Sequence, residues 1–302
     1  MNLTSLARVF AAVPKALRSN ASLDVDGKVV LITGGGQGIG LALGEILQSR
    51  GAIVVLVDID EDTVTAAADA LGERVYAVQA NVTDREAMRD AVAYVRNKFG
   101  HLDVVVANAG VTPEPATVRT MDPADFDRVI GVNLTGVFNT VHPALDDVVA
   151  AKGHVVVVSS CAAFAPGMGG SPYMVSKAGV EQLGRALRVE LAAHGASAGV
   201  AYFGIVETKM THDMLDEDDM GREVGEMLPW PLSKRITANE AASTIADGIA
   251  NRSARTIAPS VWEPYSLLRG AINIVLDRQL ADDEKVRTLV HRVEARRSQV
   301  AL

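Results

Sequence analysis

The sequence predicts an α/β fold, a doubly wound parallel sheet of about seven strands with helices on both faces. Short runs of Val, Ile and Leu alternate with amphipathic stretches from about residue 28 to residue 258. Parallel strands are buried on both faces, so near-continuous apolar runs are their expected signature. The right-handed crossover rule then leaves a doubly wound sheet as the main solution.

The apolar runs mark seven strands, at Lys28–Thr33, Ala52–Val57, Val75–Ala80, Leu102–Ala107, His154–Val158, Ala198–Tyr202 and Thr256–Ala258. Helical patterns lie between them, at Gly38–Arg50, Asp62–Leu71, Asp84–Phe99, Asp122–Ala151, Pro172–His194 and Ala238–Asn251. Pro143 lies inside the longest of these helices and predicts a kink. Residues 207–239 are rich in Met, Asp and Glu and give no strand signal, which predicts a mobile lid at about residues 207–237.

This pattern divides the chain into an N-terminal extension (1–25), a catalytic domain (26–260) and a C-terminal helical extension (261–302). The N-terminal extension is basic, with a thin apolar stripe at helical spacing. It could be a targeting peptide, a membrane-surface helix, or a segment that docks on its own protein or stays disordered. The pattern of the C-terminal extension predicts a helix that packs on the catalytic domain or on a second subunit. The alternative is a membrane role. We expect both extensions to be dispensable for the chemistry and to matter for assembly or location.

Composition excludes several classes of protein. A net charge of −8 and a pI near 5.3 argue against a nucleic-acid partner. Cys161 is the only cysteine, so an internal disulfide is impossible and a reducing compartment is expected. The six histidines have no metal-ligand spacing, and no apolar run approaches the length of a transmembrane helix. These features predict a cytoplasmic protein without a metal, with peripheral membrane contact through the extensions left open.

A glycine-rich turn follows the first strand and leads into a helix, with the sequence TGGGQGIG over residues 33–40. Glycines let the backbone approach a pyrophosphate, and N–H groups at the start of the helix point at the anion. Asp58 ends the second strand, where a carboxylate can accept both hydroxyls of an adenosine ribose. A solvated Asp at a strand end is the alternative for Asp58. The turn and the acid together predict a dinucleotide site.

Tyr173 and Lys177 are four residues apart on a predicted helix, which puts phenol and ammonium on one face. A free Tyr has a pKa near ~10 and is a poor base at neutral pH. A cation within about 4–6 Å lowers that pKa toward a range useful for general acid–base catalysis. This spacing is common on helix surfaces and specifies nothing alone. Ser159 and Ser160, however, end the fifth strand at the carboxyl edge of the sheet, where ligands bind in open α/β folds.

In order and spacing, these motifs resemble the short-chain dehydrogenase/reductase family. The matching segments are TGGGQGIG (33–40), NAG (108–110), NLTG (133–136), SS (159–160) and YMVSK (173–177). The resemblance covers about residues 26–258 and implies a Rossmann-type oxidoreductase. It implies that Tyr173 is the general acid/base, while Lys177 lowers its pKa and holds the nicotinamide ribose. Ser160 would orient the substrate oxygen, Asn133 would hold a water in a proton relay, and Ser159 would have no chemical part.

The resemblance also implies a set of cofactor contacts at the glycine turn, the adenosine side and the nicotinamide side. The set is Gly34, Gln37, Gly38, Ile39, Gly40, Asp58, Ile59, Asn81, Val82, Asn108, Ala109, Gly110, Tyr173, Lys177, Gly204, Val206 and Thr208. Two positions depart from the family pattern. Asn81 stands where Asp is frequent, which still suits an adenine amino edge. Phe203 stands where Pro is common, which removes a rigid turn residue and adds bulk to the pocket wall or the lid hinge.

The charge around Asp58 favours NAD over NADP. The carboxylate would repel the additional phosphate of NADP, and three further acids follow it at Asp60, Glu61 and Asp62. Enzymes that accept this phosphate usually supply a cation nearby. Arg50 and Arg85 are the only candidates for that part, and both lie at a distance in the sequence.

Large apolar side chains mark the expected substrate pocket and lid, and few cations accompany them. The pocket set is Phe164, Met168, Phe203, Met210, Met214 and Trp230. Because methionine fills irregular apolar space adaptably, we expect a bulky hydrophobic alcohol or ketone as substrate. The alternative is that these residues belong to the core.

We therefore predict an NAD-dependent oxidoreductase that interconverts a secondary alcohol and a ketone. Reduction of a conjugated double bond on the same fold is one alternative, and a non-catalytic NAD-binding sensor is another. Family members usually pair through the two long helices, here at about 122–151 and 172–194, so the resemblance implies a homodimer or homotetramer.

Overall fold

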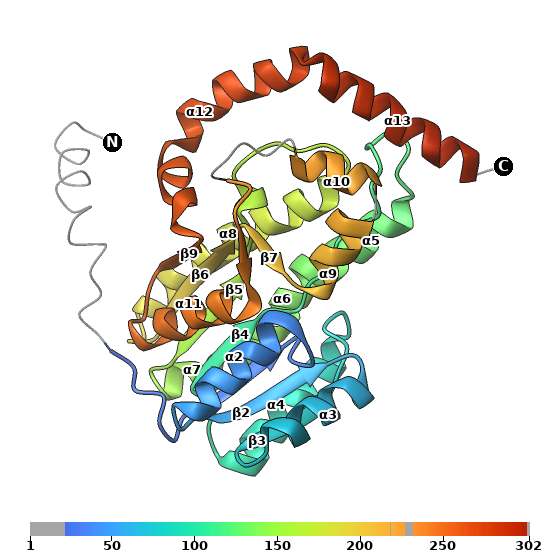
Figure 1. Cartoon of the computed structure of the whole chain (residues 1–302). Coiled ribbons are helices and arrows are strands. Elements are labelled where there is room, and N and C mark those ends of the chain that lie inside the picture. The colour runs from blue at the N-terminus through green and yellow to red at the C-terminus, as the bar shows by residue number, and fades with distance from the viewer. Residues whose placement is uncertain (1–21, 218, 227–231, 301–302) are drawn as a thin grey trace, which may run out of the picture.

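A seven-stranded parallel sheet forms the centre of the molecule (Figure 1), in the order β3-β2-β1-β4-β5-β6-β9. The computed structural model describes residues 22–217, 219–226 and 232–300. The strands are β1 Val29–Thr33, β2 Ile53–Asp58, β3 Val75–Gln79, β4 Val104–Ala107, β5 His154–Val158, β6 Ser197–Phe203 and β9 Arg255–Ala258. Strand order reverses between β1 and β4, which is the switch point where ligands bind in such sheets. The predicted fold class is confirmed.

Helices cover both faces of the sheet. Alternate residues of one strand enter different cores, as Val55 and Val57 of β2 face one apolar cluster while Val54 and Leu56 face the other. The main covering helices are α2 Gly38–Ser49, α3 Glu61–Leu71, α4 Arg85–Phe99, α8 Ser171–Ala192 and α11 Ala238–Ala250. All five follow the predicted ranges within two residues. Because both faces of the strands are buried, the apolar runs in the sequence are continuous.

The long helix predicted at 122–151 is broken into shorter pieces. These are α5 Pro123–Ile130, the π-helical turn η1 Gly131–Thr135, α6 Gly136–Val141, the 3-10 turn η2 His142–Ala144 and α7 Leu145–Ala150. Pro143 lies in η2, so the irregularity expected there is confirmed. The π turn was not predicted, and it contains Asn133. Single π turns inside helices are frequent at functional sites.

The lid region contains a strand, contrary to the prediction for residues 207–239. β7 Ile205–Glu207 pairs in parallel with β8 Arg235–Thr237. The segment between them includes α9 Lys209–His212, the π turn η4 Asp213–Glu217 and α10 Asp219–Glu226. A three-residue strand is too short to produce a periodic pattern, which explains the error.

The packed domain begins before residue 26, the expected boundary. Leu23 and Val25 are both buried, and the Leu23 N–H donates to the Ala250 carbonyl oxygen at 2.8 Å. Residues 1–21 lie outside the described residues, so the alternatives for the N-terminal extension stay open. Among the helices that the structure describes, none is long and apolar enough to cross a membrane.

The C-terminal extension is helical, as predicted. The short turn η5 Ser260–Trp262 leads into α12 Glu263–Asp282, and α13 Glu284–Val300 follows. In Figure 1, α12 runs along the outer edge of the molecule, and α13 turns back above α10 toward the side of α5. The chain therefore returns to the lid side of the sheet after completing the fold.

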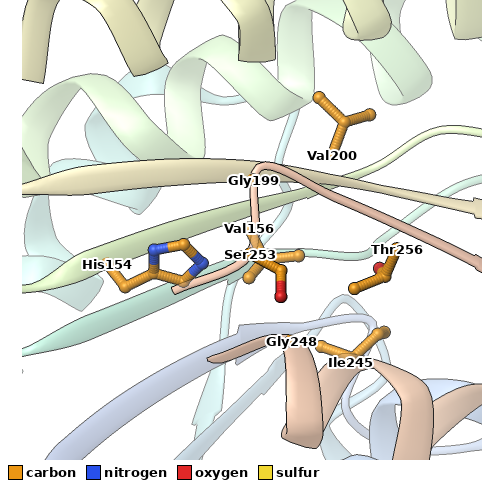
Figure 2. A pocket seen from close by; sticks show the side chains of 8 residues that line it. All are labelled: His154, Val156, Gly199, Val200, Ile245, Gly248, Ser253 and Thr256. Carbon is orange, nitrogen blue, oxygen red and sulfur yellow. The ribbon is translucent and has the colours of Figure 1, made fainter. Parts of the chain in front are cut away.

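A small enclosed cavity lies between the sheet and α11, at the amino end of β5 (Figure 2). His154 lines it, with Nδ1 2.8 Å from the Ser197 hydroxyl and Nε2 without a hydrogen-bond partner in the described part of the chain. Burial, with help from the positive charges of Arg252 and Arg188, lowers the pKa of His154 to about 3. This cavity is at the edge of the sheet opposite Ser159 and Ser160.

Candidate active site

The glycine-rich turn after β1 packs against the end of β4. Gly34 has φ +65°, and a Cβ atom there would lie 2.9 Å from the Ala109 Cα. Asn108 holds the two segments together, since its Nδ2 donates to the carbonyl oxygens of Thr33 and Gly34 at 3.0 and 3.2 Å. Only glycine fits this close approach, so the sequence motif reflects a packing need as well as a ligand need.

The start of α2 has the features of a phosphate site. Gln37 is the N-cap residue in extended conformation, and its side chain makes no capping hydrogen bond. Gly38, with φ +57°, follows, and a Cβ atom on it would lie 3.4 Å from the Thr208 Cγ2. The N–H groups of the first turn, at Gly38, Ile39 and Gly40, are therefore available to an anion. The residues present fit the pyrophosphate of a dinucleotide.

Asp58 is oriented by backbone N–H groups at the end of β2. Its Oδ2 accepts from Gly36 at 3.0 Å, and its Oδ1 accepts from Ile59 at 2.8 Å. Ile59 is 62 % exposed beside it. The two distant cations are committed elsewhere: Arg50 pairs with Asp247 at 2.8 Å, and Arg85 Nε donates to Asn139 at 3.1 Å.

The expected adenine side lies beyond β3. The Asn81 Oδ1 accepts from the Thr83 N–H at 3.0 Å and from its hydroxyl at 2.9 Å, so this oxygen stabilises the local turn. Val82 is buried, and its side chain fills the space in front of Gly136, where a Cβ atom would lie 2.7 Å from the Val82 Cγ2. Asn81 thus retains its amide N–H groups for a ligand, while Val82 packs on α6.

Asn133, Lys177 and Gly110 converge at the ends of β4 and β5. A Cβ atom on Gly110 would lie 3.3 Å from Asn133 Oδ1 and 3.4 Å from Lys177 Nζ. The Asn133 side chain exchanges hydrogen bonds with the Val111 backbone at 2.8 and 2.9 Å and donates to Ser176 at 3.2 Å. Both amide N–H groups of Asn133 are therefore used, and its side chain fixes the segment after β4. A water of the proton relay would have to be held by other atoms of Asn133.

Lys177 is buried and donates from Nζ to the Val158 carbonyl oxygen at 3.0 Å. Burial lowers the pKa of Lys177 to about 8. Its own carbonyl oxygen accepts from the Ser159 hydroxyl at 2.7 Å, which attaches this turn of α8 to the end of β5. Ser159 thus supports α8 through this hydrogen bond.

Tyr173 and Lys177 share a face of α8, with Nζ 5.5 Å from the centre of the phenol ring. Burial raises the pKa of Tyr173, a hydrogen bond with the Ser160 side chain lowers it in part, and nearby Cys161 raises it. Burial is the largest of these effects, and the lowering of the Tyr173 pKa by Lys177 stays a prediction. Ser160 itself is buried and donates to the Phe203 carbonyl oxygen at 3.2 Å.

The segment after β6 carries the residues expected at the nicotinamide side. Gly204 faces Trp262, whose Nε1 would lie 2.6 Å from a Cβ atom at this position. Val206 is buried in β7, and Thr208 caps α9 through a hydrogen bond from the Thr211 N–H at 3.4 Å. Since Thr208 also touches Gly38, the beginning of the lid lies against the phosphate turn.

The expected pocket residues are not all in one environment. Phe164 is buried against Tyr202, with ring centres 5.0 Å apart, and beneath Arg269 of α12. Phe203 is buried in the core beneath α2 and α11, and only its backbone meets Ser160. For these two, the alternative of core residues describes the structure better, because each side chain packs in an apolar cluster.

The three methionines of the set remain candidates for a pocket wall. Met168, in the turn before α8, is half-buried, and Met210 in α9 is 38 % exposed. Met214 in η4 is also half-buried. Trp230 lies outside the described residues.

The sequence did not predict the contacts that α13 makes with the segment after β4 and with α10. Glu294 accepts from the Thr117 hydroxyl at 2.9 Å and from Arg119 Nε at 3.1 Å, in the segment after β4. Two residues earlier, Arg292 donates to Glu223 of α10 at 2.6 Å. Contacts across such distances in sequence have no local signal, so the charged residues of the tail alone could not reveal them.

A parallel sheet with a glycine-rich turn after β1, an acid at the end of β2 and a Ser–Tyr–Lys set at one edge is the arrangement expected of a dinucleotide-binding oxidoreductase. The chain belongs to the short chain dehydrogenase family, which it matches over residues 28–219. The described residues contain no group of His, Cys, Asp and Glu able to hold a metal ion.

Two curated relatives carry specific names. Acetoacetyl-CoA reductase of Synechocystis sp. is 35 % identical over 210 residues, which cover 69 % of this chain and 83 % of that protein. The 3-oxoacyl-(acyl-carrier-protein) reductase FabG of Thermotoga maritima is 36 % identical over 194 residues, covering 63 % and 78 %. A solved short chain dehydrogenase/reductase from Burkholderia phymatum, in complex with NAD, aligns with a TM-score of 0.75 over 84 % of this chain and 96 % of its own, at 23 % identity. At that identity, the structural match concerns the fold.

Proposed function

We propose that this protein is an NAD-dependent oxidoreductase that interconverts a ketone and a secondary alcohol. The observation that carries the proposal is the convergence of Ser160, Tyr173 and Lys177 at the carboxyl edge of the sheet, next to Asn133 and the glycine-rich turn. Idle residues would not need a buried ammonium beside a half-buried phenol, because burying a charged group costs free energy. The sensor alternative is therefore disfavoured.

The chain's own residues would divide the work in a simple way. NAD(H) would supply or accept the hydride, held by the first turn of α2, Asp58 and Lys177. In the reducing direction, the Tyr173 hydroxyl gives its proton to the substrate oxygen, and Ser160 hydrogen-bonds that oxygen to orient it. Because burial favours the protonated phenol, the resting site is prepared for reduction. Asn133 fixes the neighbouring segment, and a water held at η1 would complete the relay.

We propose a bulky hydrophobic substrate. The half-buried methionines of the lid and of the turn before α8 suit a large apolar group. The names of the relatives favour a second, narrower candidate, a 3-oxoacyl thioester, whose 3-oxo group is a ketone on an acyl chain. A panel of steroid, terpenoid and long-chain ketones, 3-oxoacyl thioesters, sugars and hydroxy acids separates them. Best kcat/KM for sugars or small hydroxy acids would contradict both.

Tyr173→Phe tests the reaction itself. The variant removes only the hydroxyl, so kcat should fall by about 10²–10⁴-fold while NADH binding, followed by fluorescence, persists. Tyr94→Phe, on the exposed face of α4, is the matched control and should keep its activity. A tenth or more of the wild-type kcat in Tyr173→Phe would refute the mechanism. Absence of turnover on every alcohol and ketone, with NADH bound, would favour the sensor.

A further inference from the structure

Helix α12 contacts the protein through a mixed face, on which polar side chains lie beside Tyr265 and Leu276 of the apolar core. Tyr265 is buried, Arg269 pairs with Glu181 at 2.8 Å, and Asn273 Nδ2 donates to the Phe164 carbonyl oxygen at 2.7 Å. An ordinary surface helix faces the core with its apolar stripe and solvent with its polar side. α12 departs from this pattern, because the ion pair of Arg269 and the hydrogen bond of Asn273 lie on its inner face and fix its orientation.

The opposite side of α12 is apolar and exposed. Leu267, Leu268, Ile274 and Val275 are 66 %, 59 %, 75 % and 57 % exposed, and Ala271 is exposed between them. We call these five residues the α12 stripe. No described part of the chain covers it, and in Figure 1 this helix runs along the outer edge of the molecule. Contiguous exposed apolar surface of this kind marks an interaction site.

The α12 stripe is symmetric about Ala271. Leu267 and Val275 lie four residues before and after it, and Leu268 and Ile274 lie three before and after. At 3.6 residues per turn, all five share one face. Two such helices packed antiparallel about a twofold axis at Ala271 would place Leu267 opposite Val275 and Leu268 opposite Ile274, in both halves of the contact. A stripe that complements its own reverse is what an isologous interface requires.

The centre and the ends of the helix fit the same arrangement. Gly270 and Ala271 are small, and a Cβ atom on Gly270 would have nothing within 4 Å, so two helices could approach closely there. In the antiparallel register, Arg278, which is exposed, would lie level with Pro264 of the other copy. The neighbouring Glu263 is 41 % exposed and already pairs with Arg255 of its own chain, and it would add a negative charge near Arg278 of the other copy.

We propose that the α12 stripe is a docking surface for a second copy of this chain, with two α12 helices antiparallel about Ala271. The proposal is independent of the chemistry proposed above. A lipid surface is the less favoured occupant, because the chain carries a net charge of −8 and anionic lipids attract basic segments. Residues 1–21 are another candidate occupant, but neither occupant gives a reason for the symmetry of the stripe.

The test uses two single variants of the full chain, Leu267→Lys and Val275→Glu. Each places a charge against an apolar side chain of the other copy, so the dissociation constant of this contact should rise at least about tenfold, and the mass in solution should fall by half at a fixed concentration. A 1:1 mixture of the two variants should restore the wild-type mass, because the new lysine then faces the new glutamate and the other pair stays apolar. Val118→Lys, a change at a 78 % exposed residue outside α12, should leave the mass unchanged.

Sedimentation equilibrium measures the masses, with circular dichroism and NADH binding as checks of folding. Unchanged mass in both single variants would overturn the proposal, and so would a mixture that fails to recover. Vesicles of phosphatidylcholine and phosphatidylglycerol that bind the wild type but not Leu267→Lys, with equal masses, would identify a lipid surface instead. If the wild type is monomeric and associates through α12 only after deletion of residues 1–21, the N-terminal segment is the occupant of the α12 stripe, and the proposal is wrong.

Discussion

At the scale of single residues, the environment of Asp58 bears on the choice of cofactor. Its carboxylate is held by the N–H groups of Gly36 and Ile59. Both arginines that could have compensated for it are paired with other side chains. A 2′-phosphate would therefore meet a negative charge without a neighbouring cation, whereas a 2′-hydroxyl can donate to the carboxylate.

Asp58→Ser combined with Ile59→Arg should reverse the proposed preference for NAD. If about 2 kcal/mol of repulsion acts in the wild type, its ratio of kcat/KM for NADH over NADPH is roughly thirtyfold. The double variant removes the repulsion and adds a cation, so the ratio should move toward NADPH. The measurement is kcat/KM with each cofactor on one substrate, with Asp62→Ser as the control for general charge loss. A wild type that prefers NADPH, or a double variant with an unchanged ratio, would contradict the role given to Asp58.

At the scale of elements, helices and strands with a complete apolar pattern could be predicted from the sequence. β5 has the predicted bounds, and α4 begins within one residue of its predicted start, where Asp84 accepts from the N–H groups of Glu86 and Ala87. The π turn at Asn133 and the short strands β7 and β8 could not be predicted, since they add or pair too few residues to change a periodic pattern. The candidate site residues were predicted from motifs, but the core positions of Phe164 and Phe203 depend on packing partners far away in the sequence.

Helix α13 is the element whose part in the site the sequence could not suggest. Through Glu294 it holds the segment after β4, and through Arg292 it holds α10 of the lid. Leu289 and Val293, on the same helix, are buried. One helix thus links two segments that border the proposed substrate pocket. This argues against the expectation that the C-terminal extension is dispensable for substrate turnover.

Glu294→Ala should raise KM for the ketone about two- to fivefold and change kcat less. The ion pairs are partly exposed, and such pairs contribute about 0.5–1 kcal/mol, which sets that range. The variant frees Thr117 and Arg119, so the segment after β4 loses a fixed position that substrate binding would have to restore. Arg287→Ala is the control. Among the hydrogen bonds described, the Arg287 side chain contacts only Ala281 and Asp282, at the end of α12. An unchanged KM in the double variant, Glu294→Ala with Arg292→Ala, would contradict this role of α13.

At the scale of the whole molecule, the cavity at His154 makes the stability of the fold depend on pH. His154 is fully buried at the start of a central strand, and burial lowers its pKa to about 3 from an ordinary 6.5. Below pH 6.5, His154 of the unfolded chain therefore binds a proton. His154 of the folded chain does not bind it until the pH falls to about 3. Stability is lost as the pH falls through this window and is fully present above it.

His154→Gln should make the free energy of unfolding less sensitive to acid. With these two pKa values, the wild type loses about 2 kcal/mol from this group alone between pH 7 and pH 5, because each unit of difference is worth about 1.4 kcal/mol. The glutamine keeps a polar partner for Ser197 but carries no proton equilibrium, so that loss should disappear even if the variant is less stable overall. Urea unfolding at both pH values and one protein concentration measures it, and His194→Gln, at an exposed position after α8, should keep the wild-type slope. If His154→Gln also keeps that slope, the acid sensitivity of this protein arises from other groups, and the buried imidazole is not the residue that limits it.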